Sequence, residues 1–326
     1  MKIFITGASG FVGGAIAESL QDQHSIYAMA RSDASADKIR ARGWTPVRCA
    51  LTEVKASDLD GCEVVIHSAA YVEAWGTLEQ YRTANVDGTR QLLDVAREAG
   101  IRRFVHIGTE ACLFHGQAML DIDETYPYAE DSPYPYSSTK AAAEKLVLAA
   151  NDVNGLQTVS VRPRMVWGPG DQTILPEVLD MIGKGSFVWV NGGKAVTATT
   201  HIANLVHGVR LALVSEQSGE AYFVTDSEPR TVREFLEGLL ATQRVTPPTK
   251  SIPGFVLRPA AWLIESMWRI ARIKRAPPIT LFAADLLSAD CTINTAKAEQ
   301  ELGYTPVMSV EDGMRQLTEL HAQSEN

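Results

Sequence analysis

The chain has 326 residues, of which 45% are hydrophobic and 21% are charged, and its formal net charge is −9. This composition is typical of a globular protein with a large core in one or two domains. The acidic balance disfavours nucleic acid as a main partner. No apolar run reaches the roughly 18 residues of a membrane-spanning helix. The chain enters a strand without a basic leader, so we expect a cytoplasmic protein.

The cysteines and histidines predict neither a metal site nor a disulfide framework. The four cysteines (Cys49, Cys62, Cys112 and Cys291) and the seven histidines are scattered along the chain. They show no spacing typical of metal ligands, and a disulfide framework is unusual in a chain of this length.

The first half of the chain alternates short apolar runs with helical patterns. The expected strands lie at 2–6, 25–30, 45–49, 63–68, 103–107 and 157–161, and the expected helices at 11–20, 78–99 and 136–150. This alternation predicts a parallel sheet covered on both faces. Ligands of such sheets bind beyond the carboxyl ends of the strands. We therefore expect the residues that follow the strands to be neighbours: Gly7, Arg31, Ala69, Thr109 and Pro163.

The second half is less regular, with loop signals at 168–170 and 191–193 and expected strands at 196–200 and 221–225. The predicted fold is an α/β Rossmann fold, a doubly wound parallel sheet with a smaller C-terminal α/β substrate domain. The dinucleotide-binding domain is expected to span 1–167 and about 196–227. The substrate domain is expected to span about 168–195 and 228–326.

A glycine-rich loop, Thr6-Gly7-Ala8-Ser9-Gly10-Phe11-Val12-Gly13, follows the first expected strand. Gly7 permits a tight turn, Gly10 lets backbone N–H groups approach a pyrophosphate, and Gly13 lets the following helix pack closely. An anion would lie at the positive end of that helix. The loop therefore predicts dinucleotide binding, although a glycine-rich turn without a ligand has the same spacing.

Tyr136 and Lys140 open the expected helix at 136–150 and share one face of it, because they are four residues apart. A nearby ammonium group favours the phenolate form of tyrosine and lowers its pKa. The pair therefore predicts proton transfer beside the bound dinucleotide. An exposed Tyr–Lys pair on a helix surface is the alternative.

Four segments together resemble the extended short-chain dehydrogenase/reductase superfamily. They are the glycine loop, Asn85-Val86-Asp87-Gly88-Thr89, the Tyr136/Lys140 pair, and Arg162-Pro163-Arg164-Met165-Val166-Trp167-Gly168-Pro169-Gly170. The resemblance covers nearly the whole chain, and the segments occur in the family's order. Within the superfamily the chain looks most like the branch of 3β-hydroxysteroid dehydrogenases, sterol dehydrogenases, 3-keto acid reductases and dihydroflavonol reductases.

The resemblance implies a catalytic set of Thr109, Tyr136 and Lys140. Thr109 would hydrogen-bond the substrate oxygen, Tyr136 would act as general acid or base, and Lys140 would bind the nicotinamide ribose. Asn85 would support either the neighbouring helix or the cofactor. The implied cofactor contacts are Gly7, Ser9, Gly10, Phe11, Val12, Gly13, Arg31, Ser32, Ala69, Ala70, Lys140, Pro163 and Val166.

The residues after the second strand bear on the choice of cofactor. NAD-selective sites carry a carboxylate there for the ribose 2′-hydroxyl, whereas this chain has Arg31 and Ser32, with Asp33 too late. A guanidinium suits a 2′-phosphate, so we predict NADP(H), with NAD as the alternative if Arg31 stacks on the adenine. Many relatives have Gly-Asp-Leu after the third strand, and the Asp contacts the adenine. This chain has Cys49-Ala50-Leu51 there, so we expect backbone groups, Thr52 or Glu53 to contact the adenine.

Aromatic residues suggest the substrate. Trp75, Trp167, Trp189, Trp262, Trp268 and Phe114 lie in segments expected to border the site or the substrate domain. Aromatic walls suit a bulky apolar substrate better than a nucleotide-sugar. Any single tryptophan can equally belong to the core. Our candidate substrate residues are Trp75, Glu110, Phe114 and Trp167.

The segment 255–275 combines apolar residues with Arg258, Arg269, Arg272, Lys274 and Arg275, against the single acid Glu265. Such a segment could lie on a membrane surface. We favour the other interpretation, a helix or lid of the substrate domain packed on the sheet domain.

The resulting hypothesis is an NADP-dependent oxidoreductase that interconverts a ketone and a secondary alcohol on a bulky apolar small molecule. Two alternatives remain. The first is a nucleotide-sugar epimerase or dehydratase with tightly held NAD, in which Glu110 beside Thr109 would assist elimination. The second is a non-catalytic NADP-binding protein. The resemblance also suggests a homodimer paired through 78–99 and 136–150.

Overall fold

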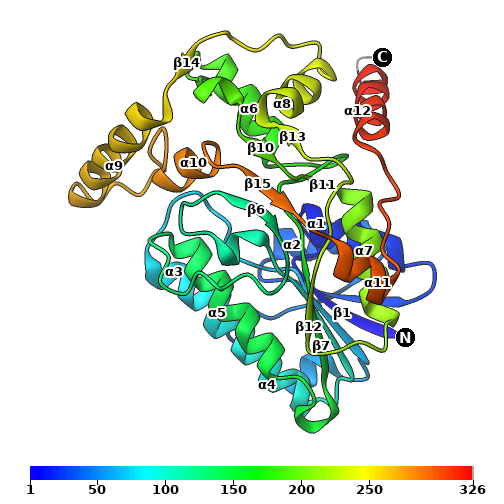
Figure 1. The fold of residues 1–326 in the computed structure, drawn as a ribbon. Coiled ribbons are helices and arrows are strands. Elements are labelled where there is room, and N and C mark those ends of the chain that lie inside the picture. Colours follow the sequence, from blue (N-terminus) through cyan, green and yellow to red (C-terminus); the bar gives the residue numbers. More distant parts are fainter. Residues whose placement is uncertain (325–326) are drawn as a thin grey trace.

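A seven-stranded sheet forms the centre of the computed structural model, which describes residues 1–324 (Figure 1). Its order is β12-β7-β5-β4-β1-β2-β3, and every neighbouring pair is parallel. The strands are β1 (Lys2–Thr6), β2 (Ser25–Met29), β3 (Thr45–Val47), β4 (Val64–His67), β5 (Arg103–Ile107), β7 (Gln157–Arg162) and β12 (Glu220–Phe223). This is the doubly wound Rossmann fold predicted from the sequence.

Alternation along the strands builds two cores, one on each face of the sheet. Ile3 and Ile5 of β1 lie in the core on the side of α1 (Phe11–Leu20), α2 (Asp33–Ala41) and α7 (Ile202–Val214). Phe4 points the other way, into the core formed with α4 (Gly88–Glu98) and α5 (Pro135–Ala149). Successive side chains of a strand face opposite sides, so both faces are buried.

The helix expected at 78–99 consists of three pieces. These are α3 (Leu78–Arg82), a π-helical turn (Thr83–Asp87) and α4. Asn85 lies in the π-helical turn, accepts a hydrogen bond from the Tyr71 backbone N–H and donates one to Thr139 on α5. The chain stays helical through all three pieces, so periodicity alone predicted one continuous helix. The wider turn places a buried amide between two segments.

A smaller part of the molecule is built around a four-stranded sheet, to which the second half of the chain contributes three strands and the first half contributes β6, inside the range expected for the dinucleotide-binding domain. Its order is β13 (Arg230–Thr231), β10 (Val196–Thr197), β15 (Cys291–Ile293), β6 (Met119–Ile122). Two further sheets of two strands each pair β8 (Val166–Trp167) with β11 (Thr200–His201) and β9 (Trp189–Val190) with β14 (Ser251–Ile252). The helices here are α6 (Ile174–Gly183), α8 (Val232–Ala241), α9 (Gly254–Ile270), α10 (Leu281–Leu286) and α12 (Val310–Ser324).

The chain crosses between the two parts more often than the sequence suggested. The expected strand at 196–200 is divided into β10 and β11, and β10 belongs to the small sheet. In the other direction, α11 (Ala296–Leu302) places Ala298 and Leu302 in the core under α7. The expected boundaries therefore differ from the structure at these elements, because long-range packing of short segments leaves no local signal.

Candidate active site

The glycine loop forms a close-packed turn between β1 and α1. Gly7 has a φ of 77°, and a Cβ there would lie 2.9 Å from the backbone nitrogen of Ala69. A Cβ on Gly13 would lie 2.5 Å from the carbonyl oxygen of Gly7. Gly10 is the N-cap of α1 and offers no side-chain cap, so the first N–H groups of the helix are available to an anion. These residues fit the pyrophosphate of a dinucleotide.

The ends of the central strands are tied together at this edge of the sheet. The Ala69 N–H donates to the Thr6 hydroxyl at 3.0 Å, and Thr6 also lies 2.8 Å from Nδ1 of His67. Farther along the edge, the Glu110 N–H donates to the carbonyl of Pro163 at 3.3 Å. The strand-end residues are therefore neighbours, as the parallel topology requires.

Thr109, Tyr136 and Lys140 converge just beyond β5. Thr109 ends the connection from β5 and caps a short 3₁₀ helix (Glu110–Leu113), with its hydroxyl accepting from the Ala111 N–H at 3.2 Å. Tyr136 and Lys140 occupy the first two turns of α5, which begins with Pro135 at a position where a missing N–H costs nothing. α5 packs along the 3₁₀ helix, which brings Tyr136 next to Thr109.

The pKa of Tyr136 is raised, which corrects the expectation that Lys140 lowers it. Burial of the phenol is the main cause, and the negative charge of Glu110 adds to it, whereas the hydrogen bond with Thr109 acts in the opposite direction. Lys140 does not offset these effects, because its ammonium group is directed to other partners. Tyr136 is therefore protonated at neutral pH and ready to donate a proton.

Lys140 lies behind the site, where its Nζ donates to the carbonyl oxygen of Ile107 at 2.9 Å and lies 3.4 Å from Nε2 of His106. Burial lowers the pKa of Lys140 to about 8, although the charge of Glu144 raises it in part. Burial and the Lys140 charge also lower the pKa of His67 to about 3 and that of His106 well below its usual range. Both histidines are therefore neutral, and Lys140 is the only one of these three groups that titrates near neutral pH.

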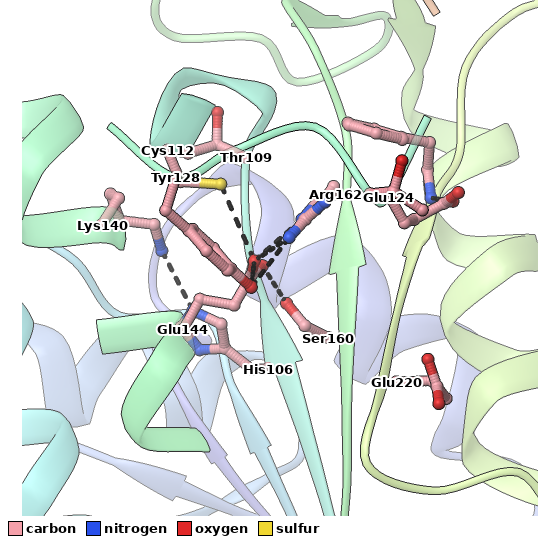
Figure 2. Close-up of polar contacts among 12 residues, drawn as sticks. His106, Thr109, Cys112, Glu124, Tyr128, Lys140, Glu144, Ser160, Arg162 and Glu220 are labelled. Atoms are coloured by element: carbon pink, nitrogen blue, oxygen red, sulfur yellow. Dashed lines mark hydrogen bonds and ion pairs between the residues drawn. The ribbon is translucent and has the colours of Figure 1, made fainter. Parts of the chain in front are cut away.

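A buried ionic network centred on Glu144 supports α5 from below (Figure 2). Oε1 of Glu144 accepts from Nε of Arg162 at 2.8 Å and from the Tyr128 hydroxyl at 2.9 Å, and Oε2 accepts from Ser160 at 2.6 Å. Burial alone would raise the pKa of Glu144, but Arg162 and these donors lower it overall. The network fixes α5, and with it Tyr136 and Lys140, against the end of β7.

A second buried ion pair fixes Thr109. Glu110 pairs with Arg164, whose Nε donates to the Thr197 hydroxyl at 3.0 Å. The other carboxylate oxygen of Glu110 accepts from the Thr109 hydroxyl at 2.8 Å. Both oxygens of Glu110 are thus engaged by the protein. This arrangement suits a residue that orients Thr109, whereas the sequence had suggested Glu110 as a substrate contact.

Aromatic side chains gather on one side of Tyr136. Phe282 of α10 makes edge-to-face contacts with Tyr136 and Tyr134, at centroid distances of 5.9 and 5.3 Å. Phe114, a candidate substrate residue, is buried behind them and stacks on Tyr134. Sequence reasoning missed Phe282, because it lies 146 positions after Tyr136 in a proline-punctuated region with no motif.

The two tryptophans proposed as substrate contacts lie elsewhere. Trp167 is completely buried in the core of the small domain, donates to Asp226 at 2.9 Å and contacts Phe235, which is the position of a packing residue. Trp75 lies in the connection after β4, where its indole donates to the carbonyl of Ile273 at 3.1 Å. It therefore joins the sheet domain to the segment after α9.

One arginine follows each of the neighbouring strands β2 and β3. Arg31 is exposed directly before α2, and Ser32 caps that helix by accepting from the Ser35 N–H at 3.2 Å. Arg48, which follows β3, donates to the carbonyl of Ala30 at 3.4 Å and pairs with Asp33 at 3.3 Å. Sequence reasoning missed Arg48, although its place after the third strand was a usable signal. The two guanidinium groups fit an additional phosphate at this edge.

No group of three or more His, Cys, Asp or Glu residues within 1–324 is arranged to hold a metal ion. The four cysteines are free thiols, and burial raises the pKa of Cys112 well above its usual range.

Comparison with known proteins identifies the family of this chain. The sequence pattern of the 3-beta hydroxysteroid dehydrogenase/isomerase family matches residues 4–252. The chain belongs to this family. As a family member, it is an NAD(P)-dependent dehydrogenase or reductase.

Individual relatives align with this chain over almost its whole length. It is 39% identical to a 4-hydroxy-2-methyl-3-oxo-4-farnesyl-3,4-dihydroquinoline-1-oxide ketoreductase of Stigmatella aurantiaca, over 96% of this chain and 95% of that protein. It is 34% identical to a 2-alkyl-3-oxoalkanoate reductase of Stenotrophomonas maltophilia, over 97% and 98%. A crystal structure of UDP-glucuronic acid 4-epimerase from Bacillus cereus with NAD superposes with a TM-score of 0.75 at 19% identity, covering 98% and 100%, and shares the fold.

Proposed function

We propose that this protein is an NADP-dependent reductase that converts a ketone on a bulky, mostly apolar small molecule to a secondary alcohol. The observation that carries the proposal is the position of Tyr136, a protonated phenol between Thr109 and the aromatic side chain of Phe282. A proton donor and an apolar wall are therefore presented to the same reacting carbon–oxygen bond.

Each residue of the site has a separate task. Gly7, Gly10 and Gly13 would hold the pyrophosphate, and bound NADPH supplies the hydride. Tyr136 donates its phenolic proton to the carbonyl oxygen as that oxygen becomes an alkoxide. Thr109, whose hydroxyl proton is held by Glu110, lies beside Tyr136, and Lys140 provides positive charge behind them.

The preference for NADP rests on the arginines that follow β2 and β3. Arg31 is exposed and directly follows Ala30, whose carbonyl oxygen accepts a hydrogen bond from Arg48. A ribose 2′-phosphate carries two negative charges that these groups can bind, whereas a 2′-hydroxyl would use neither. The carboxylate nearest this point, Asp33, already pairs with Arg48.

The apolar nature of the substrate is supported by both the site and the relatives. Phe282, Tyr134 and Phe114 form the aromatic side of the site, and the relatives named above reduce a farnesylated quinoline and a 2-alkyl-3-oxoalkanoate. The competing nucleotide-sugar dehydratase reaction needs a free acid beside Thr109. Glu110 is committed to Arg164 and Thr109, which speaks against that alternative.

The test is oxidation of NADPH or NADH by the purified protein with a panel of ketones. The panel contains 2-alkyl-3-keto acids, ketosteroids, flavonoid ketones, and UDP- and dTDP-sugars. We expect turnover of apolar ketones with NADPH preferred, and a loss of at least about a hundredfold in kcat for Tyr136→Phe. Turnover of the sugars alone would overturn the proposal. Full activity of Tyr136→Phe on every ketone would do so as well.

A further inference from the structure

α9 has two faces of different character. Its inner face packs on α10, with Leu257 and Ala261 buried against Val190 and Ala284. Its outer face is apolar but exposed. Phe255, Trp262 and Ile270 are 81, 60 and 84% exposed, and the outer face comprises Phe255, Val256, Trp262, Leu263, Met267 and Ile270.

The spacing of these residues places them on one side of the helix. Positions 255, 262, 263, 267 and 270 recur at intervals of three, four and seven residues, which is the period of one helical face. Single exposed apolar residues are common on protein surfaces, whereas a continuous stripe of this kind marks an interaction surface. The lid favoured from the sequence explains the inner face and leaves the outer face without a partner.

Positive charge flanks the C-terminal end of this stripe. Arg272, Lys274 and Arg275 are exposed and form no ion pair with any residue in 1–324. Glu265, the one acid in 254–275, points inward, where it accepts from the Leu281 N–H and pairs with Arg269. Three free cations beside an apolar stripe contrast with the net charge of −9 of the whole chain.

We propose that the outer face of α9 and the cations that follow it dock the protein on an anionic membrane surface. The apolar side chains would enter the boundary between headgroups and acyl chains, and the cations would contact lipid phosphates. None of the helices in the described residues is long and apolar enough to cross a bilayer, so α9 would lie in the plane of the interface.

Charge complementarity favours a lipid surface over a second copy of this chain. A two-fold interface brings the same patch of both copies together. The patch of α9 contains exposed cations and no exposed acid, so a second α9 would offer Arg272, Lys274 and Arg275 no opposite charge. An anionic lipid surface offers that charge at every point.

The location of the patch connects it to the active site. Figure 1 shows α9 at one side of the molecule, with α10 between it and the sheet domain. Arg258 of α9 pairs with Asp285 of α10, and Asp285 accepts from Tyr134. On the same short helix, Phe282 contacts Tyr136. A docked protein would therefore present the aromatic side of its site near the bilayer, from which an apolar substrate could enter.

Vesicle flotation of the full chain tests the proposal without reference to catalysis. The probes are phosphatidylcholine vesicles with and without phosphatidylglycerol, at low and high salt. We expect flotation with the phosphatidylglycerol vesicles at low salt and release at high salt. Failure of the unmodified protein to float with those vesicles at low salt would overturn the proposal, whatever the outcome of the ketone panel.

Two sets of substitutions, compared with one control, assign the binding to this patch. Trp262→Ser with Ile270→Ser removes apolar area, and R272Q/K274Q/R275Q removes charge. Each set should weaken vesicle partitioning by about a hundredfold, since each cation contributes severalfold near an anionic surface. The matched control is Leu120→Ser with Val214→Ser, because both residues are exposed outside the patch. Equal loss in the control, or a dimer that only the Trp262/Ile270 variant dissociates, would overturn membrane docking.

Discussion

The ion pair between Arg162 and Glu144 yields the sharpest stability prediction. Both side chains are only 1% exposed, and Glu144 also accepts from Ser160 and Tyr128. Arg162→Met would leave Glu144 buried with the neutral donors Ser160, Tyr128 and Cys112 and without its directly paired cation. Removing one partner of a buried pair costs about 3–5 kcal/mol. For a chain of this size we expect the melting temperature to fall by roughly 4–7 °C.

The sign of the pH dependence follows from the pKa of Glu144. In the native protein this pKa lies below its usual value, so the pair stabilises the fold above the range in which an unfolded glutamate titrates, and this stabilisation is lost as the pH falls through the lower native value. In Arg162→Met, burial would instead raise the pKa of Glu144. The difference in unfolding free energy between the two proteins should therefore be largest at neutral pH and shrink in acid.

Chemical denaturation at several pH values measures both effects. Arg102→Ala is the matched control, because Arg102 pairs with Glu63 at the surface and its loss should cost less than about 1 kcal/mol. The double variant Glu144→Gln/Arg162→Met should recover part of the loss, since neither buried charge remains. If Arg162→Met were no less stable than Arg102→Ala, the network would not hold α5 as described.

Three further predictions follow from single positions. Gly13→Ala should lower the unfolding free energy by about 1–3 kcal/mol and weaken dinucleotide binding, because the new Cβ would lie 2.5 Å from the Gly7 oxygen. The control Gly183→Ala has open space around its Cβ and should be neutral or stabilising in thermal melts. Lys140→Met should be more stable than the unmodified protein at pH 7, by on the order of 3 kcal/mol in unfolding free energy. This difference should shrink as the pH rises from about 8 towards 10, because native Lys140 loses its proton in that range while the lysine of the unfolded chain still keeps it. Arg31→Gln with Arg48→Gln should raise the KM for NADPH at least about tenfold and leave that for NADH nearly unchanged in steady-state assays.

The sequence predicted the parts of the site that local patterns determine. Strand, glycine turn and helix start follow one another within 13 residues, so the position of Gly7 and Gly13 could be read directly. The parallel topology then brought Ala69, Thr109 and Pro163 to the same edge, because each directly follows a strand.

What the sequence missed depends on contacts between distant segments. Phe282 reaches Tyr136 through the packing of α10 and α9, which no local period reveals. The direction of the Lys140 ammonium towards Ile107, rather than towards Tyr136, depends on side-chain packing beneath the helix. Glu144 could have been identified from the sequence, since it lies one turn beyond Lys140 on the same face of α5.

The surroundings of Tyr136 suit the acid role that reduction assigns to this residue. Reduction needs a phenol on Tyr136, and burial together with the charge of Glu110 keeps the phenol protonated. Oxidation needs a phenolate, which the same surroundings disfavour. Removal of Glu110 would also release Thr109 and Arg164, so the ion pair that fixes Thr109 also helps to keep Tyr136 protonated. In this chain, the rigidity of the site and its preference for donating a proton therefore have the same structural cause.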